Sequence, residues 1–309
     1  MKIHAHHDAD GITTAYLTQF HTGEAEIVFP KEFGDTSDFE KGDWMVDMRP
    51  QDPNIEGTVL DHHFPHPEDR KYTLIPDFPL DSFKYCTGIL PASYIAWLEF
   101  KDKIPKNEWW KLAIGLGGDG GLGFIPTELH KLCPTLSKVV KTNSYSSYGK
   151  WNISMYPMYR ILSSYINAFL RKEEYESALN LIRYSETPMD IYTSEEARIA
   201  KLDVKNEYNT IVKDADVFDY GNLSVVIYYS KYRMSGYVAT ALAQSLNNNT
   251  ILAINKRDGS ASLRGDKATY YRDVLSPLKY LTIDGHAEYM GGKLKKSYTK
   301  LLVDMDEIL

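Results

Sequence analysis

Short apolar runs that end in aspartate or histidine are the feature of this sequence that most constrains its fold. Such runs, bounded by Gly, Asp or Pro, are typical of strands, and they lie among segments of helical length and composition. We expect strands at residues 2–6, 26–30, 44–48 and 58–61, and helices at residues 11–20, 90–101 and 108–116. Strands that alternate with helices predict an α/β domain with a mainly parallel sheet. Ligands of such sheets collect beyond the carboxyl ends of the strands.

A charged helical segment separates this part from the end of the chain. Residues 156–187 are helical in pattern, and residues 194–213 are typical of an exposed connecting helix with an acidic first turn. After residue 221 the α/β alternation resumes, with LSVVIYY, a helix at 236–246, TILAINK and SASLR. We therefore expect an N-terminal domain over residues 1–190, a linker helix over 191–220 and a smaller α/β C-terminal domain over 221–309.

The composition is that of a globular protein with a real core. Of the 309 residues, 43% are hydrophobic and 25% are charged, which argues against a disordered or fibrous chain. The first residues lack the apolar stretch of a secretory signal, and no run of 18 apolar residues predicts a membrane helix. Cys86 and Cys133 lie far apart and are interpreted as free thiols of a reducing compartment. We expect a cytoplasmic protein that binds no membrane.

The charge of the chain is acidic overall but uneven. A net charge of −7 argues against a protein that coats a nucleic-acid backbone, although local binding stays open. Residues 256–300 hold ten Lys or Arg against five Asp or Glu. This surplus is interpreted either as a solvated mixed-charge face or as a patch that faces phosphate.

The densest cluster of metal-ligand residue types begins at His4, in the sequence HAHHDAD. If the strand direction continues, His4, His6, Asp8 and Asp10 share one face, because strand side chains alternate with period two. Imidazole combined with carboxylates suits Mn²⁺, Co²⁺, Zn²⁺ or Fe²⁺. Taken alone, the cluster could also be a polar loop or a fortuitous run of histidines.

Acidic residues at three further positions favour a metal site over a polar loop. Asp47 ends the run WMVD, Asp61-His62-His63 ends the run TVLDHH, and Asp119 lies among glycines in GLGGDGG. A single aspartate at a strand end is usually a cap or turn residue. Burying so many carboxylates together is costly unless cations compensate their charge, so the set predicts a metal site.

The order HxxxDxD, then Asp47, then DHH, then the glycine-rich segment of Asp119 resembles the DHH phosphoesterase superfamily. This superfamily includes RecJ-like exonucleases, nanoRNases, cyclic-dinucleotide phosphodiesterases and family II pyrophosphatases. The resemblance covers residues 1 to about 125, and HHDADGITTA is most similar to archaeal RecJ-like members. It implies a DHH catalytic domain over residues 1–190 that holds two divalent cations, expected to be Mn²⁺, with Co²⁺ or Mg²⁺ as alternatives.

The resemblance also implies the role of each residue. Asp47 would bridge the two metals, and the ligands would be His4, Asp8 and Asp47 for one, and Asp10, Asp47, His62 and Asp119 for the other. The catalytic pair would be His63, which faces the substrate, and Asp61, which orients a histidine. His6, His7 and His66 receive no role, and for them we expect local hydrogen bonding or exposure to solvent.

The C-terminal part resembles the first type of DHH-associated domain. Ser262-Leu263-Arg264 is similar to its SxR element, and residues 285–292 are similar to its GGHxxAAG loop. This implies a substrate-binding domain over residues 221–309 whose phosphate-binding residues are Arg264, His286, Gly291 and Gly292. The loop departs from the family pattern because Asp284 replaces a glycine and Tyr289-Met290 replaces a pair of alanines.

Three rival interpretations fit parts of the sequence less well. HAHHDAD also resembles the HxHxDH signature of metallo-β-lactamase-type hydrolases, but Ala9 stands where that pattern has histidine. Residues 115–120 fit GxGxxG without a clear preceding strand, so a dinucleotide-binding fold is a weak match. A RecJ-like scaffold without catalysis would be expected to have lost metal ligands.

The expected function is a Mn²⁺-dependent two-metal phosphodiesterase or exonuclease acting on single-stranded or short oligonucleotides. The alternatives are a cyclic-dinucleotide phosphodiesterase or a nucleotide phosphatase acting on substrates such as 3′-phosphoadenosine phosphate. Candidate protein partners are a second copy of the chain or a replication or repair protein.

Overall fold

The computed structural model describes residues 1–63, 66–76, 90–119, 125–137, 139–141, 155–245, 250–286 and 289–309. The chain forms two compact units. The first comprises Met1–Thr142, Met155–Leu170 and Glu174–Lys201, and the second includes Arg171–Glu173 and Leu202–Leu309. The helix at the division, α8 (Glu195–Asp214), coincides with the expected connecting helix.

The first unit is built on a five-stranded sheet in which every strand pair is parallel. The strand order is β2-β1-β3-β4-β5. The strands are β1 (Lys2–Ala5), β2 (Glu26–Val28), β3 (Trp44–Val46), β4 (Thr58–Leu60) and β5 (Thr73–Ile75). The expected parallel sheet is confirmed. The edge strand β5 was not expected from the sequence, because its three residues give too short a pattern to distinguish from a loop.

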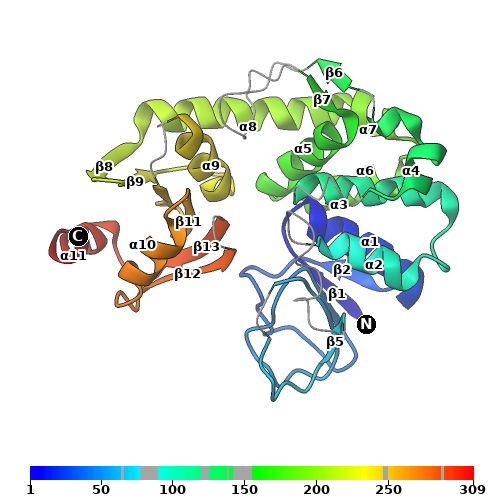
Figure 1. Cartoon of the computed structure of the whole chain (residues 1–309), viewed down its shortest axis with the longest axis horizontal. Coiled ribbons are helices and arrows are strands. Elements are labelled where there is room, and N and C mark those ends of the chain that lie inside the picture. The colour runs from blue at the N-terminus through cyan, green and yellow to red at the C-terminus, as the bar shows by residue number, and fades with distance from the viewer. Residues whose placement is uncertain are drawn as a thin grey trace. The chain divides into compact units, whose positions relative to one another are not determined.

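Helix α1 (Ala9–Thr22) packs against α2 (Ala92–Phe100) and α3 (Leu112–Gly118), as Figure 1 shows. It begins where Asp8 caps it, because an Asp8 carboxylate oxygen accepts a hydrogen bond from Gly11 N at 2.9 Å. Its first ten residues are all buried, so this helix forms part of the core. The opposite side of β3 and β4 is covered by connecting segments, through a cluster of Met45, Met48, Ile55, Val59, Tyr72 and Leu74.

The helix expected over residues 108–116 is instead two elements. A 3₁₀ helix, η2 (Lys106–Lys111), leads directly into α3. Lys111 is fully buried at the junction, where its ammonium lies 2.5 Å from a Glu108 carboxylate oxygen and 3.1 Å from Tyr16 Oη. This pairing satisfies a charge that the apolar surroundings would otherwise disfavour.

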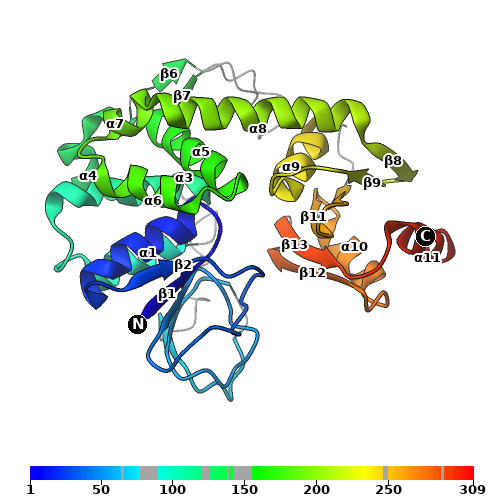
Figure 2. The ribbon, with the colours of Figure 1, turned by 180° about the vertical axis from the view of Figure 1, so that it is seen from behind.

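The expected helical region over residues 156–187 contains α5 (Met158–Arg171) and α6 (Tyr175–Tyr184), and α7 (Pro188–Thr193) follows. Helix α6 also packs on α1, as the rear view in Figure 2 shows. The remaining elements of this part are α4 (Thr127–Leu132), η4 (Pro134–Ser137), β6 (Val139–Lys141) and β7 (Met155–Pro157).

The second unit has a six-stranded mixed sheet of order β12-β13-β11-β10-β9-β8. Its strands are β8 (Asp216–Tyr220), β9 (Leu223–Tyr228), β10 (Thr250–Asn255), β11 (Ser260–Arg264), β12 (Leu281–His286) and β13 (Tyr289–Leu294). Only β9 and β10 pair in parallel. Its core packs the strands against α10 (Ala268–Leu275) and α11 (Tyr298–Ile308), while α9 (Ser235–Ser245) contacts β10 and β11. The second α/β unit is therefore confirmed.

No helix among the described residues has both the length and the apolar character needed to cross a membrane. Cys133 is a free thiol, as expected, and Cys86 lies outside the described residues.

The contact between α3 and α5 allows a test of this packing. A Cβ at Gly117 would lie 3.0 Å from Tyr159 O and still closer to Ser163 Oγ. We expect Gly117→Ala to destabilise the first unit by about 1–3 kcal/mol, because the added methyl overpacks the contact. Urea unfolding followed by tryptophan fluorescence measures this, since Trp44, Trp97, Trp109 and Trp110 lie in this unit.

An unchanged unfolding midpoint for Gly117→Ala would contradict the packing described.

Candidate metal centre

The carboxyl ends of three neighbouring strands bring most of the predicted ligands together. His6 follows β1, Asp47 follows β3, and Asp61 follows β4. Each donates its backbone N–H to the last residue of the next strand, namely Val46, Leu60 and Ile75, at 3.3, 2.8 and 3.1 Å. The parallel ladder thus places these residues at one edge of the sheet. The unexpected strand β5 has a clear role here, because it fixes Asp61.

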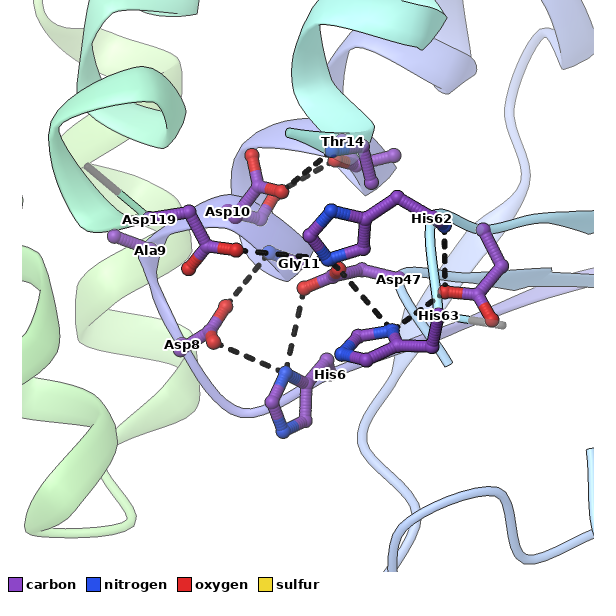
Figure 3. A network of polar contacts seen from close by, with 12 residues as sticks. His6, Asp8, Ala9, Asp10, Gly11, Thr14, Asp47, His62, His63 and Asp119 are labelled. Atoms are coloured by element: carbon purple, nitrogen blue, oxygen red, sulfur yellow. Dashed lines mark hydrogen bonds and ion pairs between the residues drawn. The ribbon is translucent and has the colours of Figure 1, made fainter. Parts of the chain in front are cut away.

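One group of possible ligands consists of His6, Asp8 and Asp47. The Nδ1 atom of His6 lies 3.0 Å from Asp8 Oδ2 and 3.3 Å from Asp47 Oδ2, as Figure 3 shows. Asp8 reaches this group from the N-cap of α1. All three ligand atoms lie within 4.8 Å of one another, which is close enough to hold a metal ion.

A second group consists of Asp10, His62 and Asp119. The Nε2 atom of His62 lies 3.5 Å from Asp119 Oδ2 and 3.1 Å from Asp47 Oδ1. Asp10 comes from the first turn of α1, and Asp119 follows the end of α3. Figure 3 shows the two groups on either side of Asp47.

Asp47 belongs to the first group and contacts His62 of the second, and it forms a third possible ligand group with His62 and His63. Its Oδ2 faces His6 and its Oδ1 faces His62. Its backbone has a φ of 58°, in the left-handed region, which aspartate adopts more readily than bulky residues do. The hydrogen bond from its N–H to Leu60 holds this conformation at the end of β3.

Asp10 is fixed by the start of α2. Its Oδ2 accepts a hydrogen bond from Ala92 N at 2.7 Å, and its Oδ1 accepts from Ser93 N at 3.1 Å and from the Ser93 hydroxyl. The first N–H groups of a helix favour a negative charge, so the carboxylate is held in place. Gly115 is required beside it, because a Cβ there would lie 2.8 Å from Asp10 Oδ1.

The hydrogen bonds of His62 determine which of its nitrogens can bind a metal. Its Nδ1 lies 2.8 Å from Leu90 O, and a carbonyl only accepts, so Nδ1 carries the proton. A neutral ring then directs the Nε2 lone pair toward the carboxylates of Asp47 and Asp119. A lone pair facing two carboxylates is repulsive unless a proton or a cation lies between them. The donor set therefore fits a divalent cation.

Asp61 lies behind the site and organises the neighbouring histidines. Its Oδ1 accepts from His62 N at 2.9 Å and pairs with His63 Nδ1 at 2.7 Å. Its Oδ2 lies 3.2 Å from His66 Nε2, and His66 Nδ1 lies 2.7 Å from Tyr72 Oη. Because Asp61 faces Nδ1 of His63, the Nε2 of that ring is left to point elsewhere.

His4 is not part of the cluster, so its predicted position there is corrected. Its Nε2 pairs with Asp43 Oδ2 at 3.3 Å, and both side chains are 3% exposed. Asp43 precedes β3 and also accepts from Lys2 N at 2.7 Å, so His4 is directed toward the amino ends of the strands. Burial lowers the pKa of His4, which favours its neutral form.

His6 occupies the place in the cluster that was predicted for His4. The prediction assumed strand alternation from His4 to Asp10, but β1 ends at Ala5 and the chain then turns into α1. The expectation of a merely local role for His6 is corrected for the same reason. The Nδ1 atom of His7 lies 3.5 Å from Tyr175 Oη, and its ring contacts that of Phe29.

The neighbouring carboxylates raise proton affinities in the metal-free site. Burial, followed by the neighbouring Asp47 carboxylate, raises the pKa of Asp10 to about 7. Burial alone would lower the pKa of His62, but Asp47 and then Asp119 hold it well above its ordinary value. Positive charge is therefore favoured between these groups.

Only some of the predicted phosphate-binding residues of the second unit lie close together in the described structure. Gly291 pairs with both Ser262 and Asp284, and Arg264 lies opposite Tyr289. The guanidinium of Arg264 donates to Met290 O and Leu263 O, and one of its terminal nitrogens lies 3.4 Å from a Cβ built on Gly236, at the start of α9.

The two predicted glycines of this unit differ in their surroundings. A Cβ at Gly291 would meet open space, whereas one at Gly292 would collide with the Thr282 carbonyl. Gly292 therefore serves close strand packing. His286 ends β12, and its side chain lies outside the described part of the structure.

The fold of this chain occurs among solved structures, although no protein-family model and no curated protein matches the chain. RecJ from Thermus thermophilus in complex with Mn²⁺ has a TM-score of 0.64 and 16% identity over 99% of this chain. The present chain spans 51% of that protein.

Two further structures extend the likeness. The DHH domain of a protein described as belonging to a family of ribosomal proteins has a TM-score of 0.59, 11% identity and coverage of 98% and 84% of the two chains. The pGpG-specific phosphodiesterase PggH from Vibrio cholerae has a TM-score of 0.51, 14% identity and coverage of 98% and 97%. The resemblance drawn from the motifs is thus supported at the level of fold, because this chain shares the fold of the RecJ structures.

Proposed function

We propose that the chain is a two-metal phosphodiesterase. The observation that carries this proposal is Asp47, whose two carboxylate oxygens each face a separate group of metal-ligating side chains. We propose that one cation is held by His6, Asp8 and Asp47, and the other by Asp10, Asp47, His62 and Asp119.

The chemistry of the ligands favours Mn²⁺. Each group combines imidazole nitrogen with carboxylate oxygen, whereas Mg²⁺ prefers an all-oxygen set. Similar RecJ structures were solved with Mn²⁺ and with Mg²⁺. Co²⁺ is a second candidate because it accepts the same ligands.

When bound, two such cations lower the pKa of a water molecule and neutralise charge on the phosphoryl oxygens. The protein's own contribution is to place proton-transfer groups beside them. Asp61 holds His63 at Nδ1, and the His63 side chain is 19% exposed, so its Nε2 can reach a substrate. We propose that His63 contacts a phosphate oxygen or supplies a proton to the leaving oxygen.

We propose single-stranded or short oligonucleotides as the substrate class. The likeness to RecJ supports this choice, as do Ser262 and Arg264 near Gly291 in the second unit. A dinucleotide phosphodiesterase is the second candidate, because the chain spans 97% of PggH but only 51% of the Thermus RecJ.

The central experiment is a Mn²⁺ assay of the pure protein against labelled single-stranded DNA, short RNA, linear and cyclic dinucleotides, and 3′-phosphoadenosine phosphate. We expect hydrolysis of at least one oligonucleotide or dinucleotide. Asp47→Asn should lower kcat at least about 1000-fold, because one substitution weakens both metal sites. A metal-loaded protein that hydrolyses none of them would favour a non-catalytic scaffold, and an unchanged kcat in Asp47→Asn would contradict the shared role of Asp47.

His6 and His4 provide a matched pair of variants. We expect His6→Asn to weaken Mn²⁺ binding and to reduce kcat/KM by more than about 100-fold, since loss of an orienting neighbour alone costs roughly 10–100-fold. His4→Asn should alter thermal stability but leave Mn²⁺ affinity near that of the parent chain. Isothermal titration with MnCl₂ separates them, and the reverse order of effects would show that the ligand set is wrong.

The pH dependence of stability follows from the raised pKa values of Asp10 and His62. The folded, metal-free chain binds these protons more tightly than the unfolded chain does. The stability that they contribute is therefore greatest at low pH and is lost as pH rises through about 7. Added Mn²⁺ replaces the protons, so the Tm increase that it causes should grow from about pH 6 to about pH 8.

Thermal unfolding with EDTA or with MnCl₂ at each pH tests this dependence, and Asp47→Asn is the control that should lose the Mn²⁺ effect. A Tm increase that stays constant or shrinks with rising pH would contradict it.

A further inference from the structure

Phe33 lies beside the candidate metal centre and is not explained by metal binding. Phe33 belongs to the connection between β2 and β3, and 42% of its surface is exposed to solvent. Its ring centroid lies 5.2 Å from that of His6 and 5.2 Å from that of His63, at interplanar angles of 87° and 80°. One exposed ring therefore contacts both a proposed metal ligand and the proposed proton-transfer residue.

The backbone at Phe33 is held firmly in this position. Its carbonyl accepts a hydrogen bond from the Gln51 side-chain amide at 2.8 Å, and Gly34 O accepts from Gln51 N at 2.8 Å. Gly34 has a φ of 69°, and a Cβ there would collide with Arg49 O. These contacts tie the loop to the segment that follows Asp47, so the ring keeps a fixed relation to the site.

The rings of Phe29 and Tyr175 differ from that of Phe33, because they pack against each other. Phe29 and Tyr175 stack on each other, with centroids 4.6 Å apart and an angle of 13°. Phe33 instead meets the two imidazoles edge to face, and much of its surface stays open to solvent. An exposed aromatic ring next to a phosphate-binding centre has the properties of a base-stacking platform.

We propose that Phe33 stacks on the nucleobase next to the phosphodiester bond that is hydrolysed. This inference rests on the proposed function and names the part of the substrate that the site recognises. The phosphate would lie at the metal ligands, and the sugar would span the short distance from there to Phe33. Every base has a π-face, so stacking alone predicts tolerance of base identity.

The test compares the shortest oligonucleotide that the parent chain hydrolyses with versions in which each base flanking the bond is replaced by hydrogen. Stacking is expected to give the base-bearing substrate an advantage in kcat/KM of roughly 5- to 150-fold. Phe33→Ala should remove most of that advantage, mainly through KM, whereas Phe33→Trp should keep it. Tyr184→Ala, which removes a 78% exposed ring from the end of α6, should change nothing.

Two measurements separate stacking from a role in positioning the imidazoles. Mn²⁺ affinity by titration should be the same in Phe33→Ala and in the parent chain. Binding of the base-bearing and base-free oligonucleotides, followed by fluorescence anisotropy with Ca²⁺ in place of Mn²⁺, makes the same comparison without turnover. Phe33→Ala should lower the affinity of the base-bearing one selectively.

Equal losses on both substrates, a weakened Mn²⁺ affinity or no loss at all would overturn the proposal. Selective loss of binding in a chain that hydrolyses nothing would support Phe33 while contradicting the proposed function.

Discussion

The crowding of carboxylates and imidazoles around Asp47 is the interaction on which the rest of this structure depends. Asp47 is 1% exposed, and Asp10 and His62 beside it are also buried. Taking several like charges out of water is unfavourable unless opposite charge lies among them. The lone pair of His62 adds to this repulsion, because the Leu90 carbonyl fixes the proton on the other nitrogen. Two cations between these groups would turn a destabilising cluster into a stabilising one.

The sheet supplies the precision that such a site needs. The site residue at the end of one strand hydrogen bonds to the end of the next, so His6, Asp47 and Asp61 are positioned in turn by β3, β4 and β5. Helix α2 completes the frame by directing its first N–H groups at Asp10. Asp61 in turn orients His63, and the loop around Phe33 is tied to the segment after Asp47. The proposed metal binding, proton transfer and substrate contact thus all rest on one edge of one sheet.

Much of the cluster around Asp47 could be predicted from the sequence, because its residues follow apolar strand patterns. Aspartates that end apolar strands must meet when the strands are parallel neighbours, and this brought Asp47, Asp61 and His62 together. The choice of His4 over His6 was wrong because strand alternation was extended past Ala5, where the chain leaves the sheet. Burial of His4 against Asp43 depends on a partner 39 residues away, which no local pattern reveals. Strand β5 and the contacts of Phe33 were not predicted because both depend on tertiary neighbours.

The most direct test of the two-metal centre is anomalous X-ray diffraction at the manganese edge from crystals of this chain grown with MnCl₂. We predict two peaks about 3.5–4 Å apart, with one Asp47 oxygen bound to each. His6 should ligate one of the ions, and His62 should ligate the other. A single peak, or a peak bound by His4 and Asp43, would contradict the shared role of Asp47.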